Sequence, residues 1–135
     1  MGLDMFFYRK EKGTANRDAS EIGYLRKANM IHGWLNNHEI GIKDCEYYVI
    51  THDVLIELKK DINTVLANSE VNSEEMIVNP STAKELIPTC EGFFFGSLQY
   101  SQMYIDDLKD TLEIVNDALI GTDFDKEEVL YYAWW

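Results

Sequence analysis

Two segments of the chain carry side chains that together could hold a flat, charged ligand. The first supplies two cations, an amide and an imidazole, and the second supplies five aromatic rings. These residues are Arg26, Lys27, Asn29 and His32, and then Phe93, Phe94, Phe95, Tyr100 and Tyr104. Aromatic rings stack on bases, and Arg or Lys holds phosphate. The set predicts a nucleotide-binding site if the segments enclose a pocket. The alternative is that the rings are core residues and the cations are solvated.

A small hydrolase is a second alternative for the same region. Cys90 lies in a loop just before Gly92, where a nearby His32 could activate its thiolate, and Asp4 is a carboxylate within an apolar run. A single loop cysteine is more often a small, half-buried hydrophobic residue. The sequence also contains no Walker, Gly-x-Gly-x-x-Gly, Gly-x-Ser-x-Gly or His-Glu-x-x-His motif. We therefore assign no catalytic residue.

Metal ligands and cofactors are not expected either. His32, His38 and His52 lack the spacing of a helical or zinc-finger ligand set. The stretch that begins at Asp123 starts like a calcium loop, but it has no glycine at the sixth position and ends at Trp134 where a bidentate glutamate is needed.

The negative charge is concentrated in the second half of the chain. Residues 1–60 hold nine Lys or Arg and nine Asp or Glu, whereas residues 61–135 hold three and fifteen, which accounts for the net charge of -12. Such a field repels phosphate backbones and attracts basic proteins. Direct nucleic-acid binding is therefore not expected, and a protein partner is favoured. A merely soluble, solvated face is the alternative.

Six residues are candidates for contact with such a partner. Four acidic residues recur at i, i+4, i+7 and i+11 and form an acidic ridge on the last helix, and two tryptophans at the C-terminus are costly to leave in water. They are Asp106, Asp110, Glu113 and Asp117, with Trp134 and Trp135.

Length and cysteine usage indicate one domain in a reducing compartment. A chain of 135 residues is the size of a single domain with its own core. It has two distant cysteines, no leader-like start and no apolar run of bilayer length, which predicts a cytoplasmic protein without a membrane partner. The sequence does not determine the oligomeric state and leaves a homodimer open.

The local patterns predict an α+β domain with about three main helices packed on a small, mostly antiparallel sheet. Apolar and aromatic runs predict strands, apolar stripes at helical spacing predict helices, and the polar stretch 69–80 is expected to be mobile in part. The expected strands are 2–9, 45–50 and 129–135, with 92–97 as an optional fourth, and the expected helices are 22–37, 51–68 and 98–120, with a short turn at 82–86.

Several stretches resemble a family of small phage and prophage proteins. The chain begins Gly-Leu-Asp-Met at residues 2–5, as those proteins often do, although Phe6 and Phe7 stand where the family has a Tyr-Leu-like pair. The similarity continues through residues 23–34, 47–49 and 86–88 and through Gly-Phe-Phe-Phe-Gly-Ser at 92–97. The resemblance implies a bacterial cytoplasm during infection or lysogeny. Small phage proteins without enzymatic motifs often act by binding a host enzyme or a signalling nucleotide.

The leading functional hypothesis is therefore a non-enzymatic phage accessory protein that binds a host protein, for example as an inhibitor of a host or defence factor. A nucleotide-binding or nucleotide-sequestering protein is the alternative, and a small hydrolase is the second alternative.

Overall fold

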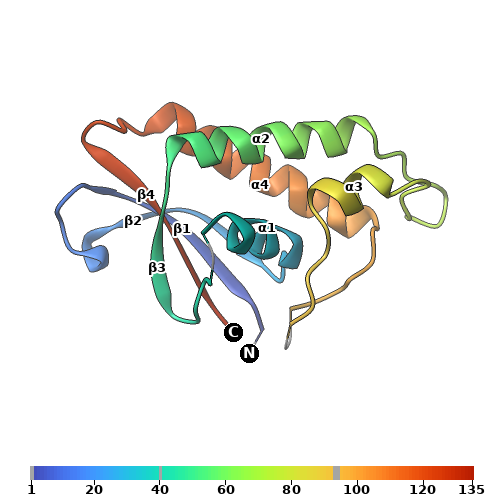
Figure 1. Ribbon diagram of the computed structural model, residues 1–135, viewed down its shortest axis with the longest axis horizontal. Coiled ribbons are helices and arrows are strands. Elements are labelled where there is room, and N and C mark those ends of the chain that lie inside the picture. The colour runs from blue at the N-terminus through green and yellow to red at the C-terminus, as the bar shows by residue number, and fades with distance from the viewer. Residues whose placement is uncertain (1, 40, 93–94) are drawn as a thin grey trace.

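The protein is a four-stranded antiparallel sheet with its helices gathered on one side (Figure 1). The computed structural model describes residues 2–39, 41–92 and 95–135. The strands are β1 (Asp4–Glu11), β2 (Ser20–Arg26), β3 (Glu46–Ile50) and β4 (Glu127–Trp134). The helices are α1 (Asn29–Glu39), α2 (His52–Ala67), α3 (Ser81–Leu86) and α4 (Gln102–Gly121), with a 3-10 turn at Asn16–Asp18. The predicted α+β class, with three main helices on an antiparallel sheet, is confirmed.

The C-terminal strand lies in the middle of the sheet. The strand order is β2-β1-β4-β3, and β4 pairs antiparallel with both β1 and β3. Met5 is opposite Ala133 and Phe7 is opposite Tyr131, so these side chains share the face that the helices cover. The predicted strands near 2–9, 45–50 and 129–135 are all present, and both chain ends lie at the same end of the sheet (Figure 1).

The prediction of one helix over residues 22–37 is wrong in its first part. Ser20–Arg26 forms β2, which makes a hairpin with β1, and the helix begins only at Asn29. Between them, Lys27 has a left-handed backbone with φ 57°, which turns the chain from strand to helix. The apolar spacing that suggested a helix is real for Ala28, Ile31 and Leu35, which are buried. Residues 20–26 form a strand instead because they pair with β1, and sequence periodicity does not reveal this contact between separate parts of the chain.

The segment before α4 also differs from the prediction. Residues 95–97 are not in a strand, and Phe93 and Phe94 lie outside the described residues. Helix α4 begins at Gln102 rather than near 98, because Ser101 forms a bridge with Met76 and the amide of Gln102 donates to the carbonyl of Glu75. The stretch 69–80 is thus hydrogen-bonded to the start of α4, although its mobility stays a prediction.

Helix α4 is held between the sheet and α2. It contacts β2 on one side and α2 on the other, which is why it buries Tyr104, Ile105, Leu108, Thr111, Ile114, Val115 and Ala118. The contact with β2 requires Gly23. A β-carbon at that position would lie 2.6 Å from a side-chain atom of Ile114. Gly121 is the last residue of the helix and lies against the guanidinium of Arg9.

Candidate functional site

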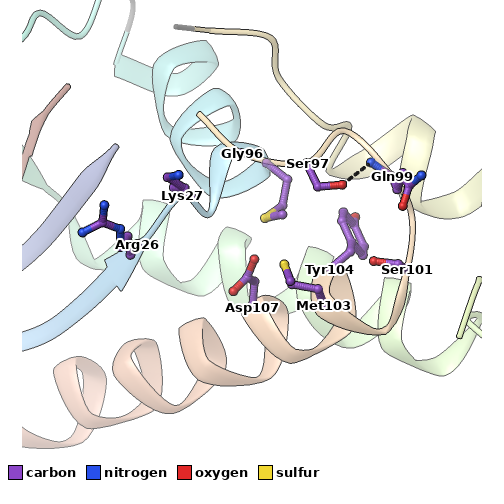
Figure 2. A pocket seen from close by; sticks show the side chains of 10 residues that line it. Arg26, Lys27, Gly96, Ser97, Gln99, Ser101, Met103, Tyr104 and Asp107 are labelled. Atoms are coloured by element: carbon purple, nitrogen blue, oxygen red, sulfur yellow. Dashed lines mark hydrogen bonds between the residues drawn. The ribbon is translucent and has the colours of Figure 1, made fainter. Parts of the chain in front are cut away.

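A cavity of about 310 Å³ opens between the end of β2, residues 96–101 and the start of α4 (Figure 2). It brings together three of the predicted ligand-binding residues, Arg26, Lys27 and Tyr104. The remaining lining residues are Met30, Gly96, Ser97, Gln99, Ser101, Met103 and Asp107. The cavity is therefore formed by two of the segments that the sequence singled out, with α4 as its floor.

The two cations occupy different positions in this cavity. The guanidinium of Arg26 lies 3.7 Å from the carboxylate of Asp4 and points away from Asp107 (Figure 2). Lys27 forms part of the wall, and Gly96 approaches it closely: a β-carbon on Gly96, where φ is +98°, would lie 2.9 Å from the β-carbon of Lys27. Both cations line the cavity, but Arg26 is also an ion-pair partner of Asp4 on the sheet.

Asn29 supports the cavity without lining it. Its buried amide nitrogen donates to the carbonyls of Phe95 at 3.3 Å and Ser97 at 2.8 Å, while its oxygen accepts from the amide of Cys90 at 2.9 Å. Each donor and acceptor of this side chain therefore holds the loop that carries Gly96 against α1.

His32 and Phe95 are core residues. Nδ1 of His32 lies 2.7 Å from the hydroxyl of Tyr131, and its ring packs edge-on against Phe95 and Trp135. Burial lowers the pKa of His32 to about 4, so the imidazole is neutral at pH 7. The structure places this predicted ligand residue inside the protein, where it has no contact with the cavity.

The two predicted tyrosines are engaged by the backbone. The hydroxyl of Tyr104 donates to the carbonyl of Ile87 at 2.7 Å, so only its ring is offered to the cavity. The hydroxyl of Tyr100 accepts from the amide of Thr89 at 3.0 Å, which holds the loop after Pro88 in place. Tyr100 does not line the cavity.

Asp107 is the charged residue of the cavity that sequence reasoning missed. It projects from α4 into the space (Figure 2), and burial, followed by the charges of Asp110 and Asp106, raises its pKa to about 6. Helical spacing assigned its two acidic neighbours to the exposed ridge. Only the packing of β2 and the 96–101 loop over this turn of α4 makes Asp107 different from them.

The three hydrolase candidates do not converge. The thiol of Cys90 packs against Gly33, and burial followed by the charge of Glu91 raises its pKa, which disfavours a reactive thiolate. Asp4 is buried and accepts a hydrogen bond from the hydroxyl of Tyr24. Among the described residues, no group of three or more His, Cys, Asp or Glu side chains could hold a metal ion.

The predicted partner-binding residues are mostly on the surface. Asp106, Asp110, Glu113 and Asp117 are all exposed along α4. The two terminal tryptophans separate, since Trp134 is 46% exposed whereas Trp135 packs against the core through His32 and Phe95.

A second candidate surface, rich in apolar side chains, lies on the face of the sheet that no helix of the described residues covers. We call it the aromatic face, and it consists of Phe6, Tyr8, Tyr24, Tyr47, Val49, Leu130, Tyr132 and Trp134. Alternation along the strands places these side chains opposite the core-facing Met5, Phe7 and Tyr131. None of them packs against the core cluster. Tyr24, Tyr47, Val49 and Trp134 are 38–46% exposed, which leaves a continuous apolar patch in contact with solvent.

The rings of this face contact one another across all four strands. Ring centroids lie 5.1 Å apart for Phe6 and Tyr24, 6.3 Å for Phe6 and Tyr132, and 4.6 Å for Tyr47 and Tyr132. Alternation in the sequence places these rings on one face. It does not show that the face is open, because a strand that is buried on both sides also has apolar residues on both faces.

Charges at the edge of the aromatic face are mainly negative. Two cations on this face are paired with carboxylates: the ammonium of buried Lys10 lies 2.8 Å from Glu128, and the guanidinium of Arg26 lies 3.7 Å from Asp4. Glu21 lies opposite Tyr8, and Asp44 lies close enough to influence Tyr132, and both are exposed. A partner for this face would therefore meet carboxylates around an apolar centre.

Comparisons with protein-family models, with curated proteins and with solved structures find no match to this chain. Within the described residues, no helix is long and apolar enough to cross a bilayer.

Proposed function

We propose that this protein acts by binding another protein, which docks on the aromatic face of the sheet. The observation that carries the proposal is the patch of rings in mutual contact on the face of the sheet that none of the described helices covers. Tyr and Trp are the side chains that most often dominate the energy of protein interfaces, because they bury a large area at a low entropic cost. Together with the resemblance to small phage proteins, this supports a host protein as the partner and binding as the activity.

Charge favours a basic protein over the other occupants of an aromatic sheet face. Stacked rings on a sheet also suit single-stranded nucleic acid, but phosphates would meet the exposed Glu21 and Asp44 and a chain of net charge -12. A second copy of the chain would bring another -12 to the same place. A protein with an apolar contact surface surrounded by Lys or Arg avoids both penalties, and its affinity should fall as salt rises.

The test is to identify the partner and then measure its affinity with purified proteins. The wild type and the variant Tyr47→Ser/Trp134→Ser are used to capture proteins from a bacterial host lysate. Each protein retained only by the wild type is then purified and titrated calorimetrically. We expect the double variant to weaken binding by at least about 30-fold, as loss of an aromatic hot spot does.

The matched control is Ile120→Ser, which removes a side chain that is 87% exposed but belongs to α4 on the helical side. This variant should bind as the wild type does. The proposal fails if Ile120→Ser weakens the same partner equally, or if the purified partner does not distinguish the double variant. It also fails if the aromatic face instead binds single-stranded RNA or a second copy of the chain, which sedimentation and oligonucleotide titration would reveal.

A further inference from the structure

We propose that the cavity floored by α4 binds a small zwitterion of the amino-acid or dipeptide type, with its ammonium group on Asp107 and its carboxylate on Lys27. This site lies at the end of β2 and the start of α4, and it does not depend on the partner proposed for the aromatic face.

Apart from Arg26, which pairs with Asp4, the cavity is lined by one charge of each sign, and the two come from different walls. Asp107 comes from α4, and Lys27 comes from the turn that follows β2 (Figure 2). Among the described residues, neither takes part in an ion pair within 4.0 Å, whereas the guanidinium of Arg26 pairs with Asp4. A ligand that carries both charges can satisfy Asp107 and Lys27 together.

The remaining walls suit an apolar side chain. Met30 is buried and Met103 is 64% exposed, and their thioethers can adapt to ligands of different shape. The ring of Tyr104 adds a flat apolar surface, since its hydroxyl is already bonded to the carbonyl of Ile87. A volume of about 310 Å³ is at the lower end of small-molecule sites and has room for an amino acid or a dipeptide.

Electrostatics favour a zwitterion over a nucleotide. A phosphate at Lys27 would lie in the field of Asp107 and of its neighbours Asp110 and Asp106, whose charges, after burial, contribute to the raised pKa of Asp107. A ligand without net charge avoids this repulsion, and its ammonium group compensates the carboxylate of Asp107.

The experiment is an NMR titration of the isotope-labelled full chain with leucine and with leucyl-glycine, and with two analogues that each lack one charge. N-acetyl-leucine has no ammonium group, and leucine amide has no carboxylate. Leucine or the dipeptide should shift the resonances of Asp107 and Gly96. Each analogue should bind at least about tenfold more weakly, which is the effect of losing one charge-assisted hydrogen bond.

Two protein variants assign the charges. Asp107→Asn should weaken the binding of leucine about tenfold and leave the binding of N-acetyl-leucine unchanged. Lys27→Gln should likewise weaken the binding of leucine about tenfold and leave the binding of leucine amide unchanged. Lys109→Gln is the control, because Lys109 is exposed on α4 and does not line the cavity. Binding should also weaken below about pH 6, where Asp107, which shares the cavity with Lys27 and Arg26, takes up a proton.

The proposal is overturned if N-acetyl-leucine binds as tightly as leucine, or if the variants weaken every ligand alike. It is equally overturned if none of these compounds shifts the cavity resonances, or if AMP or GMP does so while leucine does not. Because none of these measurements involves Tyr47 or Trp134, a failure here leaves the proposed protein-binding function untouched.

Discussion

His32 should make the protein lose stability in mild acid. Its imidazole is buried against Phe95 and Trp135 and bonded to Tyr131, and burial lowers its pKa from 6.5 to about 4. The unfolded chain therefore binds a proton between these values while the folded chain does not. The stabilisation is complete above about pH 6.5 and is lost as the pH falls towards about 4.

The magnitude follows from the two pKa values. Between about pH 7.5 and about pH 4.5, linkage gives a loss of about 2.5 kcal/mol from this group alone. The variant His32→Gln keeps an amide that can bond the hydroxyl of Tyr131 but cannot titrate. The difference in free energy of unfolding between wild type and variant should therefore shrink by about 2.5 kcal/mol on acidification. The contributions of the carboxylates to the free energy of unfolding are the same in both proteins and cancel in this difference.

Urea denaturation at several pH values is the assay, with Asp107→Asn as the common background. This background removes the titration of Asp107 from each absolute curve: the folded pKa of Asp107 is raised to about 6, so its ionisation destabilises the protein as the pH rises through the same window. Asp107 is partly exposed, and we discount its contribution to about 1 kcal/mol. An identical acid-dependent loss in the His32→Gln protein would refute the buried, neutral assignment of His32.

Two further predictions concern packing. Asn29→Ala should lower the free energy of unfolding by about 3 kcal/mol, because it leaves two carbonyls and one amide of the loop unpaired. The control Asn36→Ala removes one acceptor from the amide of Ile42 and should cost about 1 kcal/mol in the same urea experiment. Equal losses would contradict the anchoring role of Asn29. Gly23→Ala should cost about 1–3 kcal/mol in the wild type and clearly less in an Ile114→Ala background, because the clash is with that side chain. Additive thermal-melting effects would show that the two residues are not in contact.

Local pattern was enough to predict most of the elements. The apolar stripe at 51–68 was sufficient for α2, since Leu55, Leu58, Ile62 and Val65 are buried as expected. Strands near residues 2–9, 45–50 and 129–135 were also recognisable, because their β-branched and aromatic residues suit a pleated surface. These elements are predictable because the information lies within a few neighbouring residues.

The candidate sites depended on contacts between distant residues. Whether Ser20–Arg26 is strand or helix is decided by pairing with β1, and that choice moves Arg26 and Lys27 from a helix surface to the edge of the cavity. Likewise, Asp107 differs from Asp106 only because β2 and the loop before α4 pack over it.

The sequence by itself determined the fold class, the acidic charge and the approximate positions of α2, α4 and three strands, because periodicity and composition act over short stretches. The tertiary structure alone decided which face of the sheet stays uncovered and which charges share a cavity. Both depend on where segments far apart in the chain come to rest, and the alternation of Phe6 and Phe7 is the same whether or not a second layer covers the sheet.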